Sequence, residues 1–277
     1  MFCIMIGGEF EKRGINMALK IESHQNKIFK RVKGLNLRKN RDKEGLFVAE
    51  GLRFISEIPL DWPVEMFLMT EAFADENGVE LFENRAGNYI LSEELFCLLS
   101  DTENPQGVLA VCKKQKEDRG KIWLKENSFF LMAEELNDPG NLGTVIRTAD
   151  ASDVDGIFLS KGSVDVYNPK VLRATMGSIF HVPVFQNIAL DEISSELKKR
   201  EISLYAAHLK GESLPYHLPL EKSCAFLIGN EARGLSEEAA NLCDQWVKIP
   251  MPGQAESLNA SIAAGILMYE VVRQRLK

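Results

Sequence analysis

Between residues 128 and 249, short apolar segments alternate with helix-like segments, and this alternation constrains the fold more than any other feature of the chain. The first apolar segment is continuous, as is typical of a strand buried on both faces of a sheet. Strands and helices in alternation predict an α/β domain, a mostly parallel sheet with helices on both faces. The predicted strands are Ser128–Ala133, Ile157–Leu159, His181–Phe185, Leu204–Ala207, Ala225–Ile228 and Trp246–Ile249, and the predicted helices are Gly143–Ala151, Pro169–Ser178, Leu190–Arg200 and Ser236–Leu242.

The residues before this region predict a second, smaller α/β domain, and 277 residues are enough for two domains. A polar, lysine-rich stretch separates the two regions. We therefore divide the chain into a small domain at 17–112, a linker at 113–127 and a larger domain at 128–277. The strands predicted in the small domain are Phe47–Gly51, Val64–Met69, Glu80–Phe82, Tyr89–Leu91 and Pro105–Cys112, and the helices are Ile28–Leu35, Leu52–Ile58 and Ser92–Leu99.

Composition excludes several classes of protein. The net charge of −7 argues against a protein that coats nucleic acid over its whole surface. The five cysteines are scattered without a Cys-x-x-Cys spacing, which fits a reducing cytoplasm and no structural zinc, and the four histidines lie far apart, so we expect no metal. No apolar run reaches the roughly 20 residues of a membrane span. Residues 1–16 resemble no signal sequence, and we expect Met17 to be the biological start.

One short segment is strongly basic although the chain is acidic. The 17 residues Lys27–Lys43 hold eight basic side chains and a single acid, Asp42. A solvated helix face is the plainer interpretation, but such faces usually mix both signs of charge. One-sided charge of this density indicates a surface that contacts phosphates. The predicted RNA-binding residues are Lys30, Arg31, Arg38, Lys39 and Arg41.

Three irregular loops follow predicted strands of the larger domain. The first, Asn137–Ala149, holds a Pro-Gly turn, Gly143 at a point where backbones can approach closely, and Arg147 further along the helix. A purely structural interpretation would have Asn141 cap this helix and Arg147 pair with an acid. The second loop lies within Leu227–Ser236.

The third loop lies at the start of Ile249–Glu270, where prolines and a glycine fix a turn before a helix. Ser257 stands where an N-cap belongs, and the small residues that follow permit close packing against this helix. An ordinary buried terminal helix is the plainer interpretation. Because the carboxyl ends of parallel strands share one edge of a sheet, we expect all three loops to converge on one ligand site.

These three stretches closely resemble the signatures of the SpoU-type RNA ribose 2'-O-methyltransferases of the SPOUT class. The matching motifs are Asn137-Asp-Pro-Gly-Asn-Leu-Gly-Thr144 with Arg147, Ile228-Gly-Asn-Glu231 with Gly234, and Ile249-Pro-Met251 with Glu256-Ser-Leu-Asn259. They occur in the family's order, and residues 20–112 look like the RNA-binding substrate domain, akin to ribosomal-protein modules, that often precedes them. A dinucleotide-binding Gly-x-Gly-x-x-Gly is absent. Two small departures, Ala232 and Asp153 where glycine is common, touch no catalytic position.

The resemblance implies S-adenosyl-L-methionine (AdoMet) as cofactor, a homodimer formed through the larger domain, and a deep trefoil knot. In the knot, the chain after Trp246 would thread through an earlier loop, a rare arrangement that sequence patterns do not predict. The positions that match the family's cofactor-binding residues are Gly229, Ile249 and Leu258. Those that match its catalytic centre are Asn141, Arg147, Glu231, Ser257 and Asn259.

The expected activity is methylation of a ribose 2'-hydroxyl in structured RNA, with ribosomal RNA as the expected substrate. The family proposal makes Arg147 a general base helped by the substrate phosphate. Because a guanidinium stays protonated in proteins, we expect Arg147 instead to clamp a phosphate and stabilise charge on the 2'-oxygen. Three alternatives stay open: a transfer-RNA target, an antibiotic-resistance methylase of the same family, and a non-catalytic RNA-binding or assembly factor that keeps the fold.

Overall fold

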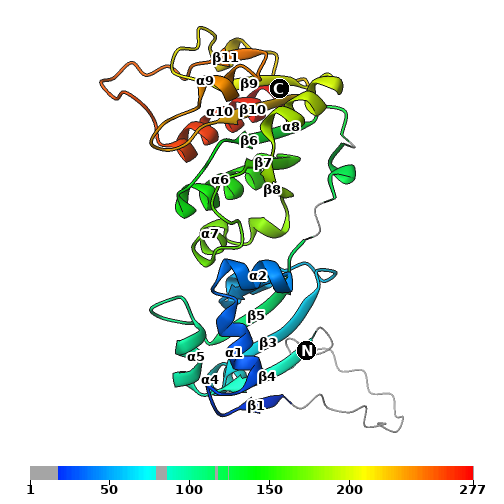
Figure 1. Ribbon diagram of the computed structural model, residues 1–277, viewed down its shortest axis with the longest axis vertical. Coiled ribbons are helices and arrows are strands. Elements are labelled where there is room, and N and C mark those ends of the chain that lie inside the picture. The colour runs from blue at the N-terminus through cyan, green and yellow to red at the C-terminus, as the bar shows by residue number, and fades with distance from the viewer. Residues whose placement is uncertain (1–17, 79–85, 116–117, 124, 277) are drawn as a thin grey trace, which may run out of the picture.

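The chain forms two sheets stacked one above the other, each with its own helices (Figure 1). This computed structural model describes residues 18–78, 86–115, 118–123 and 125–276. We call residues 18–113, which build the lower sheet, the N-terminal domain, and residues 128–276, which build the upper one, the C-terminal domain. The strand expected at Glu80–Phe82 and the expected start at Met17 lie outside the described residues.

The C-terminal sheet has six strands, and every neighbouring pair is parallel. Their order across the sheet is β11-β9-β10-β6-β7-β8. The mostly parallel sheet predicted from the sequence is thereby confirmed. The strands are β6 Phe129–Ala133, β7 Gly156–Ser160, β8 Val184–Ile188, β9 Ser203–Ala207, β10 Cys224–Ile228 and β11 Gln245–Val247.

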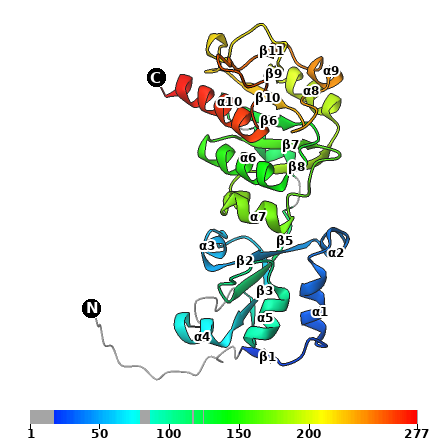
Figure 2. The same ribbon diagram turned by 90° about the vertical axis from the view of Figure 1, so that its left-hand side faces the viewer.

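Helices cover both faces of this sheet because its central strand is apolar on both sides. Phe129 and Leu131 of β6 belong to one buried cluster, and Phe130 and Met132 belong to another. The first cluster is closed by α6 Pro139–Ala151, α7 Pro169–Thr175 and α10 Ala260–Arg275, and the second by α8 Leu190–Lys199 and α9 Glu237–Ala240. Figure 2 shows α6 and α10 side by side on one face.

Within its described residues, the N-terminal domain is built on a five-stranded mixed sheet in the order β1-β4-β3-β5-β2. Its parallel pairs involve β4, and its antiparallel pairs involve β5. The strands are β1 Leu19–Ile21, β2 Leu46–Glu50, β3 Val64–Thr70, β4 Gly87–Leu91 and β5 Val108–Lys113, and the helices are α1 Lys27–Gly34, α2 Arg38–Glu44, α3 Leu52–Ser56, α4 Glu71–Asn77 and α5 Glu93–Leu99.

Two local predictions were wrong. The N-cap of α10 is Asn259, not Ser257, because the Asn259 side chain accepts hydrogen bonds from the backbone N–H groups of Ser261 and Ile262. The strand predicted at His181–Phe185 begins only at Val184, because α7 ends in a left-handed turn and a short 3-10 helix follows it.

Candidate active site

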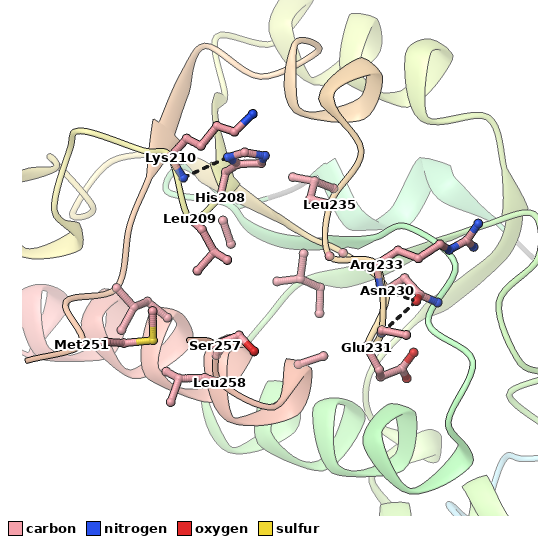
Figure 3. A pocket seen from close by; sticks show the side chains of 18 residues that line it. His208, Leu209, Lys210, Asn230, Glu231, Arg233, Leu235, Met251, Ser257 and Leu258 are labelled. Atoms are coloured by element: carbon pink, nitrogen blue, oxygen red, sulfur yellow. Dashed lines mark hydrogen bonds between the residues drawn. The ribbon is translucent and has the colours of Figure 1, made fainter. Parts of the chain in front are cut away.

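A pocket with a cavity volume of about 350 Å³ opens at the carboxyl edge of the C-terminal sheet. Its walls come from the loops after β9, β10 and β11 and from the start of α10, as Figure 3 shows. This is the edge at which parallel sheets bind ligands, and the volume lies in the usual range for a small-molecule site. The lining residues are Ala207–Lys210, Ile228–Leu235, Ile249, Met251, Ser257, Leu258, Ala260 and Ala263.

All three predicted cofactor-binding residues, Gly229, Ile249 and Leu258, line this pocket. At Gly229 the chain leaves β10 so close to the returning strand of its own loop that a Cβ atom would overlap the backbone of Leu235. The loop is held by Asn230, whose side-chain oxygen accepts the N–H groups of the two residues following Glu231 at 2.9 and 3.1 Å. The pocket wall therefore depends on a glycine and on a fixed backbone.

Beside the pocket, three of the predicted catalytic side chains form one hydrogen-bonded chain. The Asn141 amide nitrogen donates to the Glu231 carboxylate at 3.2 Å, and the Asn259 amide nitrogen donates to the Asn141 oxygen at 2.9 Å. These residues come from α6, from the loop after β10 and from the N-cap of α10. The structure thus brings three segments distant in sequence to one place, with Ser257 in the adjoining pocket lining.

Glu231 is the anchor of this chain. Its carboxylate also accepts the backbone N–H groups of Asn137 at 3.1 Å and Asp138 at 2.8 Å. Partial burial opposes ionisation, but the hydrogen bonds from Asp138, Asn137 and Asn141 outweigh it and lower the pKa of the Glu231 carboxyl below its usual range. A carboxylate so engaged has little capacity left to move a proton, and it acts by holding the Asn137–Asn141 loop in position.

Arg147 is exposed on α6, and within the described part of the chain no hydrogen bond or ion pair engages its guanidinium. The structural alternative, in which Arg147 pairs with an acid, is therefore not seen. Nor does Asn141 cap the helix, because Asp138 does so by accepting the Asn141 N–H at 2.8 Å. The Arg147 guanidinium is therefore available for contacts with a substrate, whereas the Asn141 amide is hydrogen-bonded to both Glu231 and Asn259.

His208 and Lys210 also line the pocket, although no motif in the sequence points to them. His208 Nδ1 accepts the Lys210 backbone N–H at 3.2 Å, and its ring lies 4.3 Å from that of Trp246. Burial, with help from the Lys210 charge, lowers the pKa of His208 and favours the neutral ring. His208 could have been found from its position in the sequence. It follows β9, a parallel strand that ends at the same edge of the sheet as the pocket.

The predicted RNA-binding residues differ in their exposure and in their ion pairs. Lys30 and Lys39 are exposed. Arg31 is held within the domain by Glu44 and Glu65, and Arg38 lies 3.6 Å from Asp42. For Arg41 the prediction must be corrected: its side chain is only 3% exposed and forms a buried ion pair with Asp165 of the C-terminal domain. A group so enclosed is not accessible to RNA in this structure.

Comparison with known proteins agrees with this geometry. The family model described as the SpoU rRNA methylase family matches residues 128–269, which hold all three motifs and the pocket. The chain belongs to this family. A second model, the MRM3-like substrate binding domain, matches residues 26–110. The resemblance seen in the sequence is thereby confirmed, and the chain is a SpoU-type enzyme with a substrate-binding domain before its methylase domain.

Several members of the SpoU family align with nearly the whole chain. The 23S rRNA (guanosine(2553)-2'-O)-methyltransferase RlmP of Bacillus subtilis is 34% identical over 91% of this chain and 98% of its own length. The 23S rRNA (uridine(2479)-2'-O)-methyltransferase of Streptomyces viridochromogenes is 32% identical over 87% of this chain and 88% of its own.

Solved structures of the family superpose equally well. The SpoU methyltransferase AviRb of Streptomyces viridochromogenes in complex with AdoMet aligns with a TM-score of 0.83 and 31% identity, over 91% of this chain and 99% of that one. The AdoMet-bound rRNA methyltransferase of Sinorhizobium meliloti also gives a TM-score of 0.83, at 30% identity, over 94% of this chain and 99% of that one.

Neither a membrane-spanning helix nor a metal-binding cluster occurs among the described residues. Within them, no helix is long and apolar enough to cross a membrane. The same residues contain no group of three or more His, Cys, Asp or Glu side chains that could hold a metal ion.

Proposed function

We propose that this protein transfers a methyl group from AdoMet to a ribose 2'-hydroxyl of ribosomal RNA. The observation that carries the proposal is the chain Glu231–Asn141–Asn259, which lies beside a pocket at the carboxyl edge of the sheet. It is supported by relatives that align with 91% and 87% of this chain and are named as 23S rRNA 2'-O-methyltransferases.

The pocket fits the proposed cofactor. Its lining is mainly apolar and backbone, with Gly229, Ile249 and Leu258 at the positions that match the family's cofactor site. The neutral His208 presents its free ring nitrogen, and Lys210 a cation, to a ligand that carries hydroxyl, amine and carboxylate groups. AdoMet supplies a methyl group already activated on a sulfonium. No metal is needed to activate it.

The residues of the protein then have to position the ribose and stabilise the negative charge that develops on its 2'-oxygen. Asn141 and Asn259 offer oriented amides, and Ser257 a hydroxyl, for the ribose and its neighbouring phosphate. Arg147, which no acid neutralises within the described chain, is suited to clamp the phosphate and to stabilise negative charge as it develops on the 2'-oxygen. Glu231 acts as a positioning residue, because its contacts are to the backbone and to Asn141.

The N-terminal domain is proposed to bind the RNA, with residues 113–127 as the linker. Lys30 and Lys39 are the predicted contacts that stay exposed. In Figure 1 the loop between α5 and β5 projects from the same side of the molecule as the loop that leads into α10, so RNA could touch both domains at once.

A cytoplasmic location belongs to the same proposal, because ribosomal RNA is the proposed substrate.

The knot implied by the family is also proposed here. After β11 the chain passes close beside the segment that follows β9. A Cβ atom at Gly211 would lie 2.8 Å from the Val247 carbonyl carbon, and the Lys248 N–H donates to the Ser213 carbonyl at 2.9 Å. The chain then returns as α10 to pack on α6. This close passage supports threading of the C-terminal segment.

A homodimer formed through the C-terminal domain is the remaining expectation. Ile262, Ile266 and Tyr269 are exposed on α10 at spacings of four and three residues, which puts them on one face of the helix. An exposed apolar face of this kind, on a helix next to the site, is suited to a second copy of the chain.

Two measurements separate this proposal from its alternatives. Calorimetry with AdoMet tests the non-catalytic scaffold, which predicts no binding, whereas the enzyme should bind. Mapping of 2'-O-methylation in ribosomal and transfer RNA from a strain that lacks the protein tests the substrate. Loss of one ribosomal mark is expected. Loss of a transfer-RNA mark alone would move the activity to transfer RNA.

A further inference from the structure

The contact between the two domains has an aromatic centre. Phe47, Phe54 and Trp62 of the N-terminal domain meet Tyr167 and Phe180 of the C-terminal domain, and the clearest pairs have ring centroids 4.7 to 5.3 Å apart. One buried apolar cluster therefore runs through both domains. Apolar contact holds the two domains together, but the hydrophobic effect is not directional. It therefore constrains the relative orientation of the domains only weakly.

A buried ion pair crosses the interface beside these rings. The Arg41 guanidinium donates to Asp165 Oδ2 at 2.6 and 3.1 Å, and to the carbonyls of Leu35 and Asn36 at 2.8 and 2.9 Å. The other Asp165 oxygen accepts the Tyr167 N–H at 3.1 Å. Each charge is thus fixed to the backbone of its own domain, so the pair sets both distance and direction between α2 and the loop before α7.

A second ion pair crosses the boundary at an exposed position. Arg173 of α7 donates to the carboxylate of Asp101 at 2.6 Å and to its carbonyl at 3.2 Å. Asp101 lies in the loop between α5 and β5. This loop is held in turn by Glu50, whose carboxylate accepts the Asp101 N–H at 3.1 Å and the Thr102 hydroxyl at 2.7 Å.

The rest of the interface is less tightly packed. On the side of the linker the domains leave a cavity of about 650 Å³, lined by Lys114 and Tyr167 among others. Among the described residues, the two ion pairs are the main directional contacts between the domains, and we expect the relative orientation of the domains to depend on them. Figure 1 shows α7 directly above the N-terminal domain, so a rotation between them would change the position of RNA bound to that domain relative to the candidate site.

We infer that Arg41–Asp165 and Arg173–Asp101 act as positioning residues for methyl transfer. They hold the N-terminal domain at the angle at which RNA bound to it reaches Arg147 and the Asn141–Asn259 pair. This inference rests on the proposed function, because it takes the N-terminal domain as the RNA-binding part. It assigns a role in the reaction to residues that touch neither cofactor nor RNA.

The test uses a variant that removes both buried charges, Arg41→Met with Asp165→Asn, in the full-length chain. Either single change leaves one buried charge without its partner and should lower Tm by about 10 °C. The double variant should recover most of that loss. It should bind AdoMet and ribosomal RNA within about threefold of wild type, yet transfer methyl in a single turnover at saturating RNA about 10- to 100-fold more slowly.

Arg173→Met is the second variant, and it is exposed enough to fold whatever the double variant does. It should show the same pattern, with unchanged binding and slower transfer. The matched control is Arg200→Met, which removes an arginine paired with Glu196 and stacked on Trp123 without crossing between the two domains. Its single-turnover rate should stay within twofold of wild type.

The outcomes separate the inference from the proposed function. A folded double variant, or Arg173→Met if the double variant is unfolded, with a wild-type single-turnover rate would overturn the positioning role. Small-angle scattering of the free chain should also report a wider range of domain orientations in both variants than in wild type. If wild type itself transfers no methyl, the proposed function fails, and the scattering comparison still decides whether the pairs fix the orientation.

Discussion

The side-chain nitrogen of Asn259 donates a hydrogen bond to the side-chain oxygen of Asn141 at 2.9 Å, across 118 positions of sequence. The side-chain oxygen of Asn259 caps α10 by accepting the Ser261 N–H at 2.9 Å. One side chain therefore begins the terminal helix and joins it to the start of α6. The geometry of the candidate active site therefore depends on how the C-terminal helix packs.

Glu231→Gln should destabilise the protein in a pH-dependent way. The lowered pKa of Glu231 means that its carboxylate contributes stability above the unfolded pKa, near 4.5, and loses it as pH falls through the folded value. At pH 7 we expect the free energy of unfolding to drop by about 1.5–3 kcal/mol, from lost hydrogen bonds to a charged acceptor. Urea denaturation of both proteins should show this gap closing as the pH falls below the usual titration range of a glutamate carboxyl. A gap independent of pH, or an equal one in the exposed control Glu238→Gln, would contradict the account.

Gly229→Ala should damage the cofactor pocket selectively. A Cβ atom there would overlap the backbone of Gly234 and Leu235, and backbone cannot move away as a flexible side chain can. We expect AdoMet affinity to fall by about tenfold or more, measured by calorimetry. Gly253→Ala is the matched control, because nothing lies within 4 Å of a Cβ built there and its affinity should be unchanged. Equal effects in the two variants would remove Gly229 from the pocket wall.

Lys30→Gln with Lys39→Gln should weaken RNA binding through salt-dependent contacts. Each lysine that neutralises a phosphate contributes a unit or so to the slope of log affinity against log salt, so the double variant should lower the slope by about 2. Filter binding over a salt series measures it. Lys222→Gln is the control, because Lys222 precedes β10 at the sheet edge opposite the pocket. An unchanged slope would mean that these lysines form an ordinary solvated surface.

Ile262→Asp with Ile266→Asp should convert the proposed dimer into a monomer. Charges placed in an apolar contact are costly to bury, while both side chains are exposed in the single chain and tolerate the change there. Light scattering after size exclusion should give twice 31.1 kDa for wild type and 31.1 kDa for the variant, with unchanged circular dichroism. The control is Leu60→Asp, a 90% exposed leucine of the N-terminal domain. A monomeric wild type would refute the dimer.

Much of the C-terminal domain could be predicted because its strands carry a strong local signal. The continuous apolar run of β6 predicts a strand buried on both faces, and glycines and prolines indicate where the loops end. The cap of α10 could not be chosen in the same way, since Ser257 and Asn259 are both good N-caps. What decides for Asn259 is its distant partner Asn141, which only the folded structure brings near.

The contacts of the basic segment Lys27–Lys43 could not be predicted from the local sequence alone. A run of positive charge predicts a phosphate-binding surface when its acids are elsewhere, and Arg41 fits that pattern in sequence. Its partner Asp165 lies 124 positions away, and no local pattern reveals a pairing at that distance. His208 could not be predicted as a pocket residue because a single histidine forms no recognisable spacing pattern. Its position after β9 places it in the pocket.

The central claim is tested most directly by methyl transfer in vitro. Purified wild-type protein, radiolabelled AdoMet and ribosomal RNA from a strain that lacks the protein should give one labelled nucleotide whose methyl group lies on the ribose 2'-oxygen. Arg147→Ala should bind AdoMet within a few-fold of wild type and transfer no methyl. Label on a base, no label from wild type, or wild-type turnover by Arg147→Ala would contradict the account.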